Sequence, residues 1–191
     1  MKLLYIHHVG DLYGASRSLL RLTSALHQQG HQVRVVLQED GPMRAALASA
    51  DVPVELLPCL PVLHRNRLRS PAAWLRLARD TARARRELGR LMDSFQPDIV
   101  HSNGATILPV AGFCARARGI PHVLHIREFF TEFGRAWRLY ERVLARASDR
   151  IVCVSAAVAR QFHPSVQPRV RVIHNGFPPD EFARVTPDRG A

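Results

Sequence analysis

Short apolar runs alternate along this chain with longer segments whose apolar residues recur every three or four positions. The short runs predict seven strands: Leu3–His7, Gln32–Gln38, Val54–Leu57, Asp98–His101, His122–Arg127, Arg150–Val154 and Arg169–Ile173. The longer segments predict helices: Ala15–Gln29, Pro42–Ala50, Pro71–Phe95, Ala105–Arg118, Arg135–Ala147 and Ala156–Phe162. Strands that are apolar throughout and separated by helices predict an α/β fold, a doubly wound parallel sheet of about seven strands covered on both faces.

The length of 191 residues suits one domain. We find no internal repeat and no domain boundary before about Asn175, after which the chain becomes proline-rich. The sequence therefore predicts one domain over residues 1–176, with residues 177–191 as the start of an interdomain linker or tail.

The cysteines and the apolar segments indicate a compartment. Cys59, Cys114 and Cys153 are odd in number, widely separated and form no CxxC motif, which argues against a disulfide framework or a zinc site and favours a reducing cytosol. The apolar run at the start is too short for a signal peptide, and no stretch approaches the ~20 apolar residues that span a bilayer. We expect a cytoplasmic protein that is at most peripheral to the inner membrane face.

The formal net charge is +11, and Lys2 is the only lysine among the 27 basic residues. So strong a preference for arginine indicates a GC-rich genome as much as an anionic partner. A nucleic-acid-binding module is a weaker alternative, since interleaved aromatic residues and a recognisable motif are both missing. We expect no nucleic-acid partner.

The predicted helix Pro71–Phe95 carries a basic stripe. Its arginines follow the 3,4 spacing of one helical face: Arg76, Arg79, Arg83, Arg86 and Arg90. The residues expected to face the core are Leu75, Ala78, Ala82, Leu88, Leu91, Met92 and Phe95. With Trp74 near its start, the stripe could rest on anionic lipid. The alternative is a solvated face in an arginine-rich chain.

Ligands of such sheets bind where strands end and helices begin, so the strand-end loops are the candidate site. The loop from His7 to Ser18 contains Gly10 and Gly14, which would let backbone N–H groups approach an anion at a helix N-terminus. It is neither GxGxxG nor a phosphate-binding P-loop, which argues against a nicotinamide dehydrogenase and a nucleotide hydrolase. An ordinary strand–helix turn remains the alternative.

Two further loops offer side chains with chemistry. His101 and Asn103 are expected at a strand end, where a histidine could orient a sugar hydroxyl or act as a base; the alternative is a structural histidine beside an N-capping asparagine. Arg127 suits a phosphate or a carboxylate, and Glu128 follows it; the alternative is an Arg–Glu pair that fixes the loop. Alternation places His125 on the face of Arg127.

The last two loops have simpler expected roles. Ser155 is expected to cap the following helix. Asn175 and Gly176 tolerate positive φ and predict a sharp exit from the last strand.

In their order and spacing these segments resemble the N-terminal domain of GT-B glycosyltransferases of family 4, a group of retaining enzymes. The matching elements, in chain order, are Gly14-Ala15-Ser16-Arg17-Ser18-Leu19, Leu26 with Gly30-His31-Gln32-Val33, Pro97-Asp98-Ile99-Val100-His101, Gly119-Ile120-Pro121, Asp149-Arg150-Ile151-Val152-Cys153-Val154-Ser155 and Val172-Ile173-His174-Asn175-Gly176. The resemblance covers residues 1 to about 182 and implies a Rossmann-like domain that is one half of a GT-B fold.

The resemblance implies the acceptor-binding half of an enzyme that transfers a sugar from a nucleotide-sugar to a saccharide or lipid-linked acceptor, without metal or other cofactor. Carried over to this chain, it makes Arg127, Glu128 and His101 catalytic-side residues. The residues it implies for substrate binding are Gly10, Tyr13, Gly14, Asn103, Ser155 and Asn175.

The sequence departs from the family pattern in three places. Tyr13 replaces a glycine, Arg17 lies near a glutamate position, and Arg127 stands where the family often has a histidine. The Glu-x7-Glu element that binds the donor in the second domain cannot be placed after Asn175, so the 191 residues alone are expected to be inactive. Half of a GT-B nucleotide-sugar epimerase, which needs no acceptor, is the alternative function.

Overall fold

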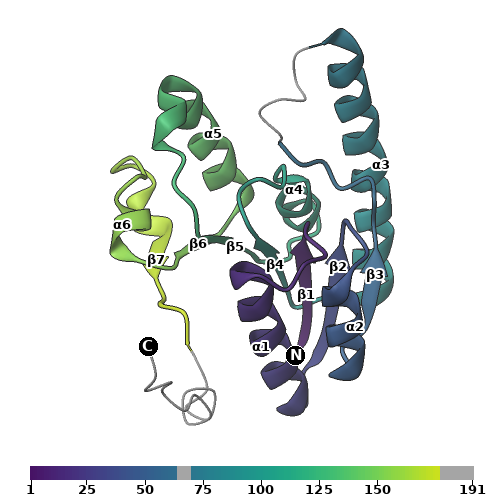
Figure 1. The fold of residues 1–191 in the computed structure, drawn as a ribbon. Helices are drawn as coiled ribbons and strands as arrows, with labels where there is room; N and C mark the ends of the chain where they lie inside the picture. The colour runs from purple at the N-terminus through teal and green to yellow at the C-terminus, as the bar shows by residue number, and fades with distance from the viewer. Residues whose placement is uncertain (64–69, 177–191) are drawn as a thin grey trace, which may run out of the picture.

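A seven-stranded sheet, parallel throughout, forms the centre of the computed structural model, which describes residues 1–63 and 70–176 (Figure 1). Its strands are β1 (Lys2–His7), β2 (Gln32–Leu37), β3 (Val54–Leu56), β4 (Ile99–Asn103), β5 (His122–Ile126), β6 (Arg150–Cys153) and β7 (Val170–Val172). The order β3-β2-β1-β4-β5-β6-β7 reverses once, between β1 and β4. The predicted Rossmann-like, doubly wound α/β fold is confirmed.

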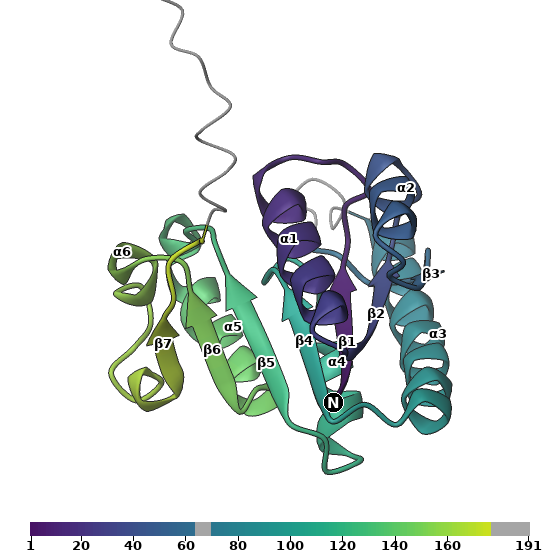
Figure 2. The same ribbon diagram turned by 90° about the horizontal axis from the view of Figure 1, so that it is seen from below.

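The helices are α1 (Gly14–Gln28), α2 (Pro42–Ser49), α3 (Pro71–Phe95), α4 (Val110–Arg116), α5 (Gly134–Ala147) and α6 (Ala156–Ala159), with 3-10 turns η1 (Thr131–Phe133) and η2 (Gln167–Arg169). Figure 2 shows α1 and α2 on one face of the sheet, with α3, α4 and α5 behind it.

The strands divide their side chains between these two layers because successive residues point to opposite faces. Leu3, Tyr5, Val33 and Val35 pack with Leu19 of α1 and with α2 in one core cluster. On the opposite face two further clusters form: one joins Leu4, Ile6 and Val100 to α3 and α4, and the other joins Leu124, Ile126 and Ile151 to α5 and α6.

Two predicted helices are shorter than expected. The helix predicted over Ala156–Phe162 ends at Ala159, and the helix after β4 starts late. The pattern predicted a helix from Ala105, but α4 begins at Val110. Gly104 has φ of +127°, and the backbone of the next residues pairs with the segment after β3: Leu63 N–H donates to the Thr106 carbonyl at 2.8 Å, and Leu108 N–H to that of Pro61 at 2.8 Å. These bonds replace the first turns of the predicted helix.

The predicted core face of α3 is correct only in its second half. Leu88, Leu91 and Met92 are buried, whereas Leu75 is 73% exposed and Ala78 and Ala82 are also exposed. Figure 1 shows the start of α3 extending past the sheet, so it has no strand to cover. Ser70 caps this end, accepting the Ala73 N–H at 3.2 Å, and Pro71 occupies the first turn as predicted.

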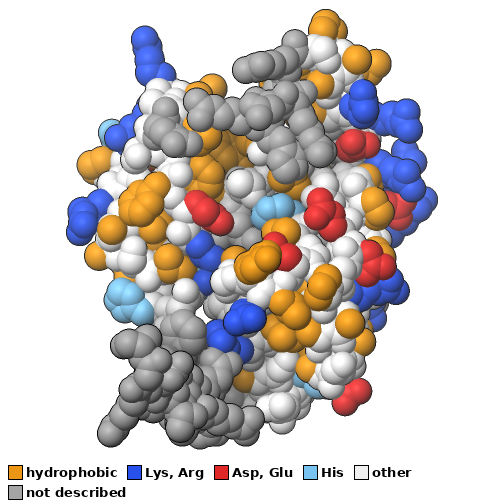
Figure 3. Space-filling model, viewed as in Figure 1, with side chains coloured by type: hydrophobic (Ala, Val, Ile, Leu, Met, Phe, Trp, Pro, Cys, Tyr) orange, Lys and Arg blue, Asp and Glu red, His pale blue; other side chains and the backbone are white. Residues whose placement is uncertain are grey.

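The arginine stripe of α3 is exposed as its spacing predicts. Figure 3 shows basic side chains following the edge of the molecule formed by α3, with hydrophobic side chains at its upper end. Trp74 is 56% exposed at this end. No helix in the described ranges, 1–63 and 70–176, has the length and apolar character to cross a bilayer. All three cysteines are buried and free.

Candidate functional site

The sheet reverses its order between β1 and β4, and this switch point is where open α/β sheets form a ligand crevice at the carboxyl ends of the strands. Beside it lies a hollow of about 580 Å³, which we call the switch-point cleft. Its lining residues come from α1, the end of β5, the end of β6 and the exit from β7: Tyr13, Gly14, Ala15, Arg17, Ser18, Arg21, Arg127, Glu128, Val154 and Asn175. Figure 3 shows basic side chains gathered in the lower middle of this view.

Arg127 lies at the centre of a set of hydrogen bonds beside the cleft. It follows the last residue of β5, and its guanidinium donates from Nη1 to Asn175 Oδ1 at 2.7 Å, from Nη2 to Ser18 Oγ at 3.1 Å and from Nε to Asn103 Oδ1 at 3.3 Å. Arg127 therefore joins α1, β4 and the chain leaving β7. Sequence reasoning named Arg127, Asn103 and Asn175 as site residues. It placed Ser18 in the matching segment 14–19 but did not predict this role for it.

The acceptors around Arg127 are neutral. Within the described part of the chain it forms no ion pair with Glu128, so the predicted alternative of an Arg–Glu loop pair is not what the structure shows. Partial burial lowers the pKa of Arg127, and the nearby Glu128 charge raises it, without removing the positive charge. Arg17 and Arg21 also line the cleft, and Glu128 is the one acid among its described lining residues, so this part of the site is electropositive and suits an anion.

The start of α1 adds backbone donors to the same cleft. Tyr13 is the N-cap residue but supplies no side-chain cap, and no acidic residue occupies the first turn. The first N–H groups of a helix lack intrahelical acceptors, and the helix dipole makes this end positive. Gly14 has open space where a Cβ would be, and Tyr13 is 79% exposed. Both predicted residues thus line the cleft.

Gly10 lies differently from Gly14. A Cβ on Gly10 would stand 2.6 Å from the Asp40 carbonyl oxygen, and one on Gly41 would stand 2.5 Å from the Gly10 carbonyl oxygen. The Gly10 carbonyl also accepts the Met43 N–H at 2.9 Å. Gly10 therefore joins the loop after β1 to the loop after β2; this contact explains the glycine without a ligand, and a binding role for it stays a prediction.

The sequence predicted His101 at the end of a strand, and this was wrong. In the structure β4 continues two residues further, to Asn103. The His101 ring lies within the sheet, 4.9 Å from the Tyr5 ring and 5.6 Å from the His125 ring, centroid to centroid. Burial lowers the pKa of His101 to about 3 and that of His125 to about 4, so both are neutral at pH 7. His101 is not among the residues that line the switch-point cleft.

Asn103, Glu128 and Ser155 complete the predicted set. Asn103 ends β4, is 2% exposed and contacts Arg127, rather than capping a helix. Glu128 is exposed in the cleft. Ser155 caps α6 as predicted, its Oγ accepting the Val158 N–H at 3.2 Å, and that bond accounts for the residue without a ligand.

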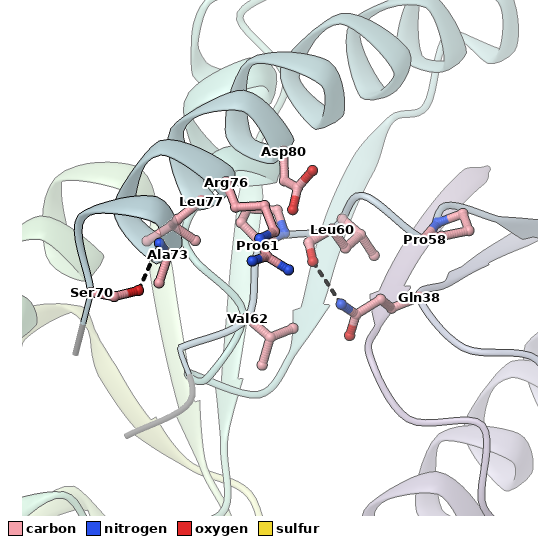
Figure 4. A pocket seen from close by; sticks show the side chains of 10 residues that line it. All are labelled: Gln38, Pro58, Leu60, Pro61, Val62, Ser70, Ala73, Arg76, Leu77 and Asp80. Carbon is pink, nitrogen blue, oxygen red and sulfur yellow. Dashed lines mark hydrogen bonds between the residues drawn. The ribbon is translucent and has the colours of Figure 1, made fainter. Parts of the chain in front are cut away.

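A second hollow of about 480 Å³ lies under the start of α3 (Figure 4). Its floor is Leu60, Pro61 and Val62, and Leu77, Arg76 and Asp80 reach it from α3. Gln38, which follows β2, donates to the Leu60 carbonyl at 2.8 Å beside it. This hollow therefore also lies at the carboxyl end of a strand, and sequence reasoning missed it because the segment after Pro58 has no helical or strand periodicity.

In the described part of the chain, no group of three or more His, Cys, Asp or Glu side chains is placed to hold a metal ion. The cleft offers guanidinium groups, the Glu128 carboxylate, the Ser18 hydroxyl, the Asn175 amide and the start of α1, which has no side-chain cap.

The comparisons with known proteins agree with this geometry. The family profile of Glycosyltransferase Family 4 matches residues 13–181, which is most of the chain, and the protein belongs to that family. No curated protein sequence matches it.

Solved structures share the fold. A crystal structure of Anabaena Alr3699/HepE in complex with UDP-glucose superposes with a TM-score of 0.66 at 20% identity, covering 93% of this chain and 44% of that one. A glycosyltransferase from Rickettsia africae ESF-5 gives 0.66 at 16% identity, covering 98% and 47%. A putative UDP-N-acetylglucosamine 2-epimerase from Listeria monocytogenes gives 0.55 at 14%, covering 89% and 44%.

The chain therefore spans about half the length of these structures, and its fold is that of the N-terminal domain of a GT-B glycosyltransferase of family 4.

Proposed function

We propose that this chain is the acceptor-side domain of a retaining glycosyltransferase that uses a nucleotide-sugar donor, and that the switch-point cleft receives the donor's phosphates and transferring sugar. The observation that carries the proposal is the convergence of Arg17, Arg21 and Arg127 with the uncapped start of α1. Oriented N–H groups and guanidinium groups stabilise the charge that a departing nucleoside diphosphate develops.

The relatives support a nucleotide donor. Alr3699/HepE has been crystallised with UDP, with UDP and glucose and with UDP-glucose. We expect the second domain to bind most of the nucleotide, so that the phosphates lie between the two domains with α1 pointing at them. Transfer with retention then takes place on one face of the sugar, in the interdomain cleft.

Glu128 and the α3 hollow are the proposed acceptor side. Glu128 is exposed beside Arg127 and has no ion pair within the described residues, so it can accept a hydrogen bond from an acceptor hydroxyl. The hollow under α3 offers an apolar floor with Arg76 and Asp80 at its rim, which suits a saccharide or the first part of a lipid-linked acceptor.

The test is donor hydrolysis and sugar transfer by the full-length enzyme. Arg127→Ala should lower kcat/KM by about 100-fold, because the substitution removes a guanidinium group that stabilises the negative charge developing on the leaving nucleoside diphosphate. Arg150→Ala, an exposed arginine at the start of β6, is the matched control and should leave kcat/KM within about twofold of the wild type. Equal kinetics for the two variants would contradict the assignment.

A nucleotide-sugar epimerase is the second candidate, because the Listeria structure shares the fold. Product analysis separates the two. Incubation of the full-length enzyme with donor alone should return unchanged nucleotide-sugar or slow hydrolysis, whereas an isomerised nucleotide-sugar would show an epimerase.

We also propose a cytoplasmic location with peripheral contact at the anionic inner face of the membrane through the basic side of α3. The exposed arginines and Trp74 support it: cationic side chains attract anionic headgroups, and tryptophan favours the interfacial region. No nucleic-acid partner is expected.

A further inference from the structure

Five polar side chains near the switch-point cleft touch one another in series, and we call them the polar relay. They are, in order of contact, Arg127, Asn103, His7, Ser16 and Asp11. The three central members are almost fully buried: His7 is 0% exposed, Ser16 1% and Asn103 2%. Buried polar groups need partners, so each contact in the series limits the choice of the next.

The protons of the polar relay can be assigned from its anionic end. Ser16 Oγ lies 2.9 Å from Asp11 Oδ1, and a carboxylate oxygen can only accept, so the Ser16 hydroxyl proton points to Asp11. Ser16 Oγ also lies 3.0 Å from His7 Nε2. Because the serine has no second proton, His7 Nε2 must carry a hydrogen and donate it.

The role of Nδ1, the second nitrogen of the His7 ring, follows from the charge of the ring. Burial lowers the pKa of His7 to about 4, so the ring is neutral and its Nδ1 is an acceptor. Asn103 Nδ2 donates to it at 3.1 Å. The side-chain oxygen of Asn103, Oδ1, then faces Arg127 and accepts a hydrogen bond from its Nε at 3.3 Å. The Asn103 carbonyl oxygen, 3.3 Å from Nδ1, adds no second bond because neither atom has a proton to give.

Every donor in the polar relay therefore points the same way, from the guanidinium cation to the Asp11 carboxylate. Bonds aligned in this manner polarise one another. The carboxylate oxygen that ends the series also accepts the backbone N–H of Tyr13 at 3.1 Å, in the loop that begins α1. The two sides of the cleft, Arg127 after β5 and the Tyr13–Gly14 segment at the start of α1, are thus joined through the buried side chains of His7, Ser16 and Asn103.

We propose that the polar relay couples the position of Arg127 to the conformation of the loop that begins α1, and that His7 and Ser16 are positioning residues for the cleft. The coupling itself is a property of this chain; its consequence for catalysis rests on the proposed function. An anion drawn to Arg127 then meets backbone N–H donors of α1 that are already held in place, without contacting His7 or Ser16 itself.

The first experiment measures the relay in the 191-residue chain by NMR with ¹⁵N-labelled histidine. His7, identified by the signal lost in His7→Phe, should show the Nε2–H tautomer between pH 8 and about pH 5. Asn103→Asp keeps an acceptor for Arg127 but removes the donor to Nδ1, so His7 should become protonated at Nδ1. An Nδ1–H tautomer in the unsubstituted chain would overturn the assigned direction.

The second experiment measures the coupling by hydrogen exchange in the same chain. Asn103→Asp and Ser16→Ala each interrupt the relay, and both should increase exchange of the Tyr13 amide by about tenfold. Ser148→Ala is the matched control: Ser148 is 1% exposed and its Oγ lies 3.1 Å from Nδ1 of another buried histidine, His122, outside the cleft. Equal Tyr13 exchange in Ser16→Ala and Ser148→Ala would overturn the coupling.

The third experiment measures the consequence in the full-length enzyme. Ser16→Ala should lower kcat by about threefold to tenfold, measured at a temperature where both variants remain folded, because it leaves the buried His7 Nε2–H without its acceptor and also costs stability. Ser148→Ala should not alter kcat. Absence of any transferase activity in the unsubstituted enzyme would count against the proposed function and leave the exchange result to decide the coupling. Normal kcat in Ser16→Ala would remove the positioning role.

Discussion

At the scale of single residues, buried neutral histidines set both the polar relay and the response of the fold to acid. Burial lowers the pKa of His7, His122 and His125 to about 4 and that of His101 to about 3. Each is expected to titrate near 6.5 in the unfolded chain. The unfolded state therefore binds more protons than the native state between about pH 6.5 and pH 4.

The first prediction is a loss of stability in weak acid. A depressed histidine pKa contributes stability that is complete above pH 6.5 and is lost as the pH falls toward the folded-state value. Each of these histidines should lower the free energy of unfolding by up to about 2 kcal/mol between pH 7.5 and pH 5. Urea unfolding at the two pH values measures this. His122→Gln should make the dependence on pH shallower; an unchanged pH dependence in that variant would contradict the assignment.

At the scale of elements, the loops after β1 and β2 are held together by two glycines whose Cα atoms leave no room for a methyl group. The second prediction follows: Gly10→Ala should destabilise the protein by about 1–3 kcal/mol, because the added Cβ meets backbone rather than a side chain that can move aside. Denaturant unfolding measures the change.

Gly14→Ala is the control for this prediction, since a Cβ there meets no atom within 4 Å and alanine favours a helix. It should not lower stability. Equal destabilisation in the two variants would show that the contact between Gly10 and Asp40 is not what requires the glycine.

The third prediction concerns α3. The combined substitution of Arg76, Arg79 and Arg83 by glutamine should reduce retention on vesicles containing anionic phosphatidylglycerol by at least tenfold, because each basic side chain near such a surface contributes about 1 kcal/mol. Vesicle flotation with the full-length enzyme measures retention at physiological salt.

Substitution of Arg146, Arg150 and Arg160 by glutamine removes the same charge from exposed positions outside α3 and is the control. Equal loss of retention in both triple variants would indicate a response to net charge rather than to the α3 surface. No retention of the unsubstituted enzyme would rule out the membrane proposal.

At the scale of the whole molecule, the proposed function makes this domain one wall of an interdomain cleft. Arg127, Glu128 and the start of α1 all face outward at the carboxyl edge of the sheet, and the solved relatives are about twice as long as this chain. Catalysis requires groups that bind the transition state more strongly than the ground state, and here only one side of the reacting sugar would be contacted.

The fourth prediction is therefore that the purified 191-residue chain does not transfer sugar, while the full-length enzyme does. Radiolabelled donor and product analysis, with the same concentration of each protein, makes the comparison. Turnover by the isolated chain at a rate near that of the full-length enzyme would contradict it.

Much of this molecule follows from local sequence pattern. The apolar runs and helical periodicities predicted all seven strands and the main helices, because strands buried on both faces are apolar throughout and helix burial repeats every 3.6 residues. The strand-end rule also predicted Arg127, Glu128 and Gly14 at one edge of the sheet, because parallel strands end at the same edge. Tyr13 was predicted only from the family resemblance.

Only the tertiary structure decided which side chains touch. His101 was expected at a strand end, but hydrogen bonding to β5 extends β4 to Asn103, so the histidine lies within the sheet. The helix expected from Ala105 was replaced by pairing with the segment after β3, and the exposed start of α3 depends on how far the sheet extends beneath it. The polar relay joins residues 11, 16, 103 and 127 across the sheet reversal, and contacts so distant in sequence arise from strand order, which local pattern does not specify.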